Sequence, residues 1–231
     1  MTADRLDRDL AALLARRLRA GESEDPTALR RLLAEAANPA LVLRVRREVD
    51  AAARPISALA LWGGKDLLRT LDLARARFGA AAPLRSVSKP EEALAAARTP
   101  GAVAVLALEP GLAWWGRLLA EPALQVFAAL PDAAPAGAAP EALAVAAVDT
   151  EPTGADETFW VTDAPEPAAR IESALGREGL AGQLLLAAGG LKLFALAGYV
   201  QRQDERLSRA PGRLAGVIGS APVPFDLREP R

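Results

Sequence analysis

The run Ala102-Val103-Ala104-Val105-Leu106-Ala107-Leu108 is continuously apolar. Such a run is typical of a strand that is buried on both faces of a sheet. Shorter apolar strands are predicted before it at 57–62 and 84–87, and helical patterns at 66–78 and 90–98 separate the three strands. The order strand-helix-strand-helix-strand predicts a parallel sheet with right-handed crossovers.

Downstream of this unit the pattern changes to closely spaced strands. A helix is predicted at 111–120, strands at 124–130 and 142–148, and an Ala/Pro/Gly-rich linker at 131–140 between them. In the last third, strands are predicted at 157–162, 183–187, 191–197 and 214–218, with helices at 166–178 and 203–209. Strand-helix-strand-strand-helix-strand is the ferredoxin-like order, which by itself does not establish a function.

The first 54 residues read as three short helices. Leu6, Leu10, Leu13, Leu14 and Leu18 recur at the spacing of one helix face. Asp25-Pro26 and Asn38-Pro39 each combine an N-cap with a proline at the first helical position. We therefore expect three parts, namely a helical segment at 1–54, an α/β domain at 55–150 and a ferredoxin-like domain at 151–231.

Composition excludes several kinds of chemistry. The chain has no Cys and no His, which excludes disulfides, thiolate nucleophiles and imidazole bases, and we expect no metal site and no cofactor. Its 28 cationic and 29 anionic side chains give a net charge of −1, so we expect neither nucleic acid nor an anionic membrane as a partner. The charged start at 1–7 and the absence of a long apolar run predict a cytoplasmic protein.

The segment Leu6-Asp7-Arg8-Asp9-Leu10-Ala11-Ala12-Leu13-Leu14-Ala15-Arg16-Arg17 resembles the opening helix of the all-helical chorismate mutases, whose wording is close to "(I/L)D..L..LL..R". The resemblance places Arg17 where that family holds a substrate carboxylate, and makes Arg17 the candidate catalytic residue. Arg5 lies near the place of the family's partner-chain arginine and is a candidate substrate ligand.

The middle of the chain resembles the prephenate dehydratases. A helix that ends in Phe78-Gly79, the "EEAL" of 91–94 and the strand 103–109 follow in that family's order. The segments 193–199 and 217–222 resemble strands of its ACT regulatory domain. The implied fold class is α+β with an α/β part, in which a helical segment precedes a parallel-sheet dehydratase-like domain and a ferredoxin-like (ACT-like) domain.

The resemblance implies a role in aromatic amino-acid biosynthesis. If the protein is active, it would isomerise chorismate to prephenate, and a prephenate dehydratase role ranks behind that. One alternative is a non-catalytic small-molecule-binding or regulatory pseudoenzyme with the same architecture, and another is a structural dimerisation protein. The implied partners are a small carboxylate such as chorismate or prephenate and a second copy of the chain in a homodimer.

Other candidate ligands lie outside the first helix. Gly63-Gly64-Lys65 follows a predicted parallel strand, at the kind of strand-to-helix turn where anions often bind, although a tight turn with an exposed lysine is the simpler interpretation. Thr158 lies near the position of the dehydratases' threonine motif. Arg47 belongs to a run of arginines that forms a solvated helix face or lines an anion site beside Arg17.

Overall fold

The computed structural model describes residues 38–53 and 56–226. Its helices are α3 (Pro39–Ala53), α4 (Leu67–Phe78), α5 (Pro90–Ala97) and α6 (Ala168–Arg177), with short 3-10 helices η1 (Trp114–Ala120) and η2 (Glu205–Arg209). Its strands are β1 (Ala58–Trp62), β2 (Leu84–Ser86), β3 (Ala102–Ala107), β4 (Gln125–Leu130), β5 (Ala142–Ala146), β6 (Asp156–Thr162), β7 (Gly182–Ala188), β8 (Leu191–Ala197) and β9 (Ala215–Pro222).

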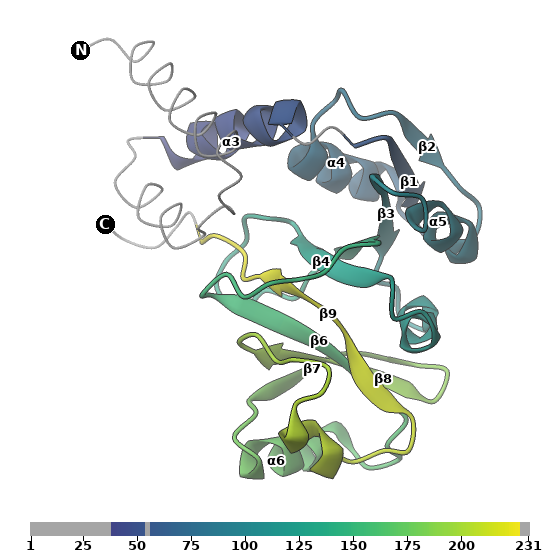
Figure 1. Cartoon of the computed structure of the whole chain (residues 1–231), viewed down its shortest axis with the longest axis vertical. Helices are drawn as coiled ribbons and strands as arrows, with labels where there is room; N and C mark the ends of the chain where they lie inside the picture. The colour runs from purple at the N-terminus through teal and green to yellow at the C-terminus, as the bar shows by residue number, and fades with distance from the viewer. Residues whose placement is uncertain (1–37, 54–55, 227–231) are drawn as a thin grey trace.

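The nine strands form one mixed sheet in the order β2-β1-β3-β5-β4-β9-β6-β8-β7. Strand β1 pairs in parallel with β2 and β3, as the sequence predicts for that unit. Beyond β3, strand β5 lies between β3 and β4 and is antiparallel to both. The later pairs are also antiparallel, except for β4 with β9, which is parallel. Figure 1 shows the sheet running from the α3–α4 end of the molecule to the α6 end.

One face of the sheet carries a single buried cluster along almost its whole width. The cluster takes side chains from every strand except β2, and α5 and η1 supply Ala93, Leu94, Trp114, Trp115 and Leu118. The strands contribute through period-two alternation, as when Phe159 and Val161 of β6 face this cluster and Trp160 faces the other way. A shared core of this kind joins the two halves of the chain into one packing unit.

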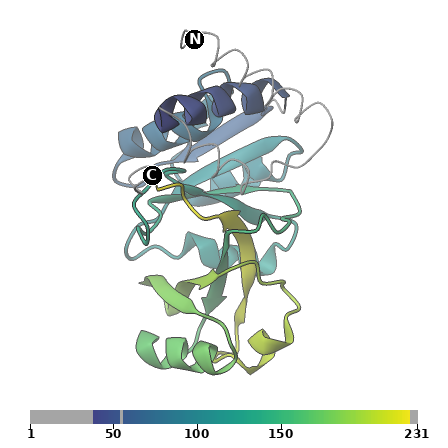
Figure 2. The same ribbon diagram turned by 90° about the vertical axis from the view of Figure 1, so that its left-hand side faces the viewer.

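The opposite face is divided between two smaller clusters. Helix α4 covers β1, β3, β4 and β5 with Leu73, Ala74 and Phe78, and α3 packs against α4. Helix α6 covers β6, β8 and β9 with Ile171 and Leu175. Figures 1 and 2 show α4 and α6 at opposite ends of the sheet.

The two halves of the sheet meet where β4 lies beside β9. Val126 is the paired partner of Gly219, and the register of each flanking ladder shifts next to this point. Gly219 has a φ of 141°, and a Cβ at that position would overlap the Val126 backbone, with the carbonyl carbon only 2.8 Å away. Glycine is therefore required for the close approach of these two strands.

The expected fold class is wrong. The chain does not form a dehydratase-like domain and a separate ferredoxin-like domain, because β4 and β9 join the strands of both regions into one sheet over one core. The predicted helices at 111–120 and 203–209 are the shorter 3-10 helices η1 and η2. The predicted helices before residue 38 lie outside the described residues, and the boundaries at 54 and 150 stay predictions.

We expect Gly219→Ala to lower the free energy of unfolding by about 3–5 kcal/mol, because the new Cβ meets backbone atoms that cannot rotate away. Gly190→Ala is the matched control, since Gly190 has a φ of 79° and nothing within 4 Å of a Cβ, so only the conformational cost of about 1 kcal/mol applies. Denaturant unfolding measures both variants. Equal losses would show that the β4–β9 approach tolerates a methyl group.

Candidate functional site

The loops that follow β1 and β3 lie side by side at one edge of the sheet. Strand β1 leads through α4 to β2 on one side, and the chain then returns through α5 to β3 on the other side. Helices α4 and α5 cover opposite faces. The strand order therefore reverses between β1 and β3, and the carboxyl end of such a switch point is where open α/β sheets bind ligands.

The turn after β1 holds a carboxylate from the loop after β3. The backbone N–H of Lys65 donates a hydrogen bond to Oε1 of Glu109. Gly64 has a φ of 56°, and a Cβ on this residue would overlap the Glu109 carboxyl group, whose Cγ would lie 2.9 Å away. The Glu109 carboxylate therefore occupies the space that a side chain at position 64 would need.

Three other charged side chains at this edge, Asp66, Arg69 and Glu141, already have hydrogen-bonding partners. Asp66 caps α4, where its Oδ1 accepts the N–H of Arg69 at 2.9 Å. The Arg69 guanidinium binds Glu141 through two hydrogen bonds, with Nε and Oε2 at 2.8 Å, and the bond from Arg69 holds the pKa of the Glu141 carboxyl below its usual range. Glu141 is placed by its own carbonyl, which accepts the N–H of Leu108 at 2.8 Å.

Apolar side chains are unusually exposed around the same loops. Leu67 and Leu68 in the first turn of α4 are 42% and 74% exposed, and Leu112 after β3 is 38% exposed. They are three of the five large hydrophobic residues that are exposed in the described part of the chain. Apolar surface beside a switch-point turn is typical of a small-molecule site.

The structure brings together only part of the candidate set. Gly63, Gly64 and Lys65 lie at this edge, whereas Arg5 and Arg17 lie outside the described residues. Arg47 on α3 donates from Nη1 to the carbonyl of Ala76 at 3.5 Å. Ala76 is ten residues beyond Asp66, so this contact lies about 15 Å along α4 from the Lys65 turn.

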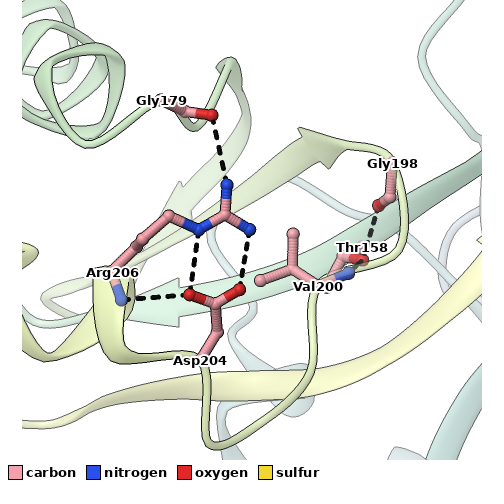
Figure 3. Close-up of polar contacts among 6 residues, drawn as sticks. All are labelled: Thr158, Gly179, Gly198, Val200, Asp204 and Arg206. Atoms are coloured by element: carbon pink, nitrogen blue, oxygen red, sulfur yellow. Dashed lines mark hydrogen bonds and ion pairs between the residues drawn. The ribbon is translucent and has the colours of Figure 1, made fainter.

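The Thr158 hydroxyl forms hydrogen bonds inside the protein and is not available to a ligand. Thr158 is fully buried in β6, and its Oγ1 donates to the carbonyl of Gly198 at 2.8 Å and accepts the N–H of Val200 at 2.8 Å (Figure 3). Both hydrogen-bonding functions of the hydroxyl are thus used inside the protein. Thr158 fixes the turn after β8, and the Lys65 turn is at another part of the sheet.

Sequence reasoning missed Glu109 and the exposed leucines as parts of this edge. Glu109 directly follows the apolar run at 102–108, just as Gly63 follows the strand at 57–62. The rule that parallel strands present their carboxyl ends at one edge could have paired the two loops. The burial of a leucine depends on tertiary packing, and no sequence pattern marks Leu68 as exposed.

Among residues 38–53 and 56–226, no group of three or more His, Cys, Asp or Glu side chains could hold a metal ion. Within the same residues, no helix is long and apolar enough to cross a membrane.

Comparisons with known proteins do not place the chain in a family. No family model matches it, and no curated protein matches it. A solved structure described as "GqqA- a novel type of quorum quenching acylases" shares 14% sequence identity over 75% of this chain and 98% of that chain, with a TM-score of 0.48. A likeness at this level carries no conclusion about function.

The resemblance to chorismate mutases and prephenate dehydratases with an ACT domain is therefore wrong, and so are the functions drawn from it. No family model supports it, and the chain forms one continuous sheet instead of separate dehydratase-like and ferredoxin-like domains. The short motifs have local causes. Phe78-Gly79 is a buried side chain followed by the C-cap of α4, and the "EEAL" of 91–94 is the start of α5, with Glu91 and Glu92 in its first turn and Ala93 and Leu94 buried.

The pair Asp204–Arg206, which is linked by hydrogen bonds, allows a test of local electrostatics (Figure 3). The Arg206 guanidinium, and next the Arg206 backbone N–H, lower the pKa of the Asp204 carboxyl to about 2. We expect Arg206→Gln to raise this pKa, but to leave it below the ordinary value because the backbone bond remains. A carbon-13 NMR titration of the carboxyl measures the change.

The pH window follows from the direction of this shift. A carboxyl whose pKa is lowered by folding stabilises the protein above its unfolded pKa, and the stabilisation is lost as the pH falls toward about 2. Arg177→Gln, at an exposed position on α6, is the control and should leave Asp204 unchanged. An unchanged Asp204 pKa in Arg206→Gln would contradict the assignment of the guanidinium as its main cause.

Proposed function

We propose that the protein binds a small organic carboxylate at the carboxyl edge of β1 and β3, against the turn Gly63–Asp66. The observation that carries the proposal is the hydrogen bond from the Lys65 N–H to the Glu109 carboxylate. This turn already accommodates a carboxylate in the space that the absent Gly64 side chain leaves. A ligand carboxylate would take the place of Glu109.

Charge at the turn supports an anionic ligand. The Lys65 side chain is exposed, and within the described residues no carboxylate forms an ion pair with its ammonium group. Arg69, the next cation along α4, is held by Glu141 and keeps a fixed place beside the turn. The ammonium of Lys65 is thus the group that can move onto an incoming carboxylate, at the modest gain expected of an exposed pair.

The exposed leucines support a ligand with an apolar body. Leu67 and Leu68 directly follow the turn in the sequence and Leu112 comes three residues after Glu109, and all three leave apolar surface open to solvent. Burial of apolar surface contributes about 25 cal/mol per Å², so contact with these side chains can add more to affinity than an exposed ion pair. We therefore favour monocarboxylates with a ring or a branched alkyl group.

Partners, oligomeric state and location complete the proposal. The net charge of −1 gives no general attraction for a polyanion, so we propose that neither nucleic acid nor an anionic membrane is the main partner. A homodimer stays a prediction that sedimentation velocity would test. A cytoplasmic location stays a prediction that cell fractionation would test.

Nitrogen-15 NMR titration with cyclohexanecarboxylate tests the proposal, with cyclohexanecarboxamide as the neutral control of the same shape. We expect saturable shifts of the amide signals of Gly64, Lys65, Asp66 and Leu112 with the acid and smaller shifts with the amide. Equal responses to the two compounds, or shifts spread over the surface without saturation, would contradict carboxylate recognition at this turn.

Gly64→Ala should abolish the saturable response, because its methyl group fills the carboxylate position. Gly179→Ala is the matched control, since Gly179 also has a positive φ, 75°, but a Cβ there meets nothing within 4 Å. Gly179→Ala should bind the acid as the unmodified protein does. Unchanged binding by Gly64→Ala would move the site away from this turn.

A further inference from the structure

Glu157 occupies an unusual position on the central strand β6. It is paired with Ala221 of β9 on one side and with Ala197 of β8 on the other. The row continues to Ala181, whose carbonyl accepts the N–H of Ala197 at 2.8 Å. Directly opposed residues of antiparallel strands point to the same face. Glu157 is therefore the one polar side chain in a row whose other members are Ala221, Ala197 and Ala181, the last of which directly precedes β7.

The face to which Glu157 points is the face of the large core. Phe159, two residues along β6, and Ala221 both belong to the cluster that spans the sheet. Phe159 is fully buried and Ala221 is 1% exposed, whereas Ala181 and Ala197 are exposed. Glu157 therefore lies at the margin of this core, half-buried, with small side chains beside it in both directions.

No group in the described residues compensates the Glu157 carboxylate. It takes part in no hydrogen bond or ion pair there, unlike its neighbours in the strand. Asp156 accepts the N–H of Thr153 at 2.8 Å, and Thr158 uses its hydroxyl twice. A carboxyl group that loses water without gaining a partner is costly, and such groups are more common at functional sites than elsewhere.

We propose that Glu157 is the anchor of a second ligand site, which takes a primary ammonium group carried on a small apolar body. The short, exposed side chains of Ala181 and Ala197 offer apolar surface for the body. The ammonium group would supply the hydrogen bonds and the positive charge that no described residue provides to Glu157. A partly desolvated ion pair with hydrogen bonds is stronger than one in open water.

Electrostatics agree with this geometry. Burial raises the pKa of the Glu157 carboxyl, and no neighbouring charge contributes to the shift. A bound ammonium group would favour the ionised form and bring the pKa down again. The site is independent of the carboxylate-binding turn, since β5, β4 and β9 lie between β3 and β6 in the sheet.

NMR titration of the full chain with n-butylammonium chloride tests the inference, with tetramethylammonium chloride, which cannot donate a hydrogen bond, as the control probe. We expect saturable shifts of the signals of Glu157, Ala197 and Ala221, and a lower Glu157 pKa at saturation, with n-butylammonium. Glu157→Gln should weaken this binding at least about tenfold, as the loss of a charged hydrogen-bonding partner implies. Glu151→Gln, at an exposed glutamate, should leave it unchanged.

Each result bears on the inference. Equal pKa changes with the two cations, or equal binding by Glu157→Gln and the unmodified protein, would overturn it. The pKa measurement uses the unmodified protein, so it decides the matter even if Glu157→Gln folds poorly. Because cyclohexanecarboxylate reports on the Lys65 turn and n-butylammonium on Glu157, failure at one site is distinguishable from failure at the other.

Discussion

The approach of β4 to β9 at Val126 and Gly219 is the constraint on which the architecture depends. The parallel pairing of β4 with β9 joins five strands on one side of the sheet to four on the other. The backbone of Val126 occupies the space where a side chain of residue 219 would be, so the two strands can meet only at a glycine. The core cluster that spans the sheet takes side chains from the strands on both sides of this contact.

The continuous core joins the two halves of the sheet through aromatic side chains of η1. Trp114, Trp115 and Leu118 of η1 are buried together with Phe159 of β6 and Ile218 of β9. The N–H of the Trp114 indole is satisfied by the carbonyl of Ala107 at 2.8 Å, which ties η1 to the end of β3. Large aromatic side chains contribute much of the apolar area that a core buries, and here they lie between the halves.

The same arrangement positions both proposed sites. The Lys65 turn is at a switch point because the chain leaves β1 through α4 to β2 on one side and returns through α5 to β3 on the other. Glu157 is half-buried because β6 lies inside the sheet, between β9 and β8. At the Lys65 turn, the absence of a side chain on Gly64 makes room for a carboxylate. At Glu157, the carboxylate has no hydrogen-bonding or ionic partner among the described residues.

Local pattern determined much of the secondary structure, and tertiary structure decided the rest. The apolar run at 102–108 and the helical periodicity at 66–78 predicted β3 and α4, because a strand buried on both faces and a helix buried on one face each have their own spacing of apolar residues. Strand order and the separation into domains produce no such local spacing. They depend on contacts between distant residues, such as Val126 with Gly219, and nothing in the sequence distinguishes Gly219 from the other 17 of the 18 glycines. For the same reason Gly63-Gly64-Lys65 was recognised as a turn, whereas its partner Glu109, 44 residues away from Lys65, was placed beside it only by the pairing of β1 with β3.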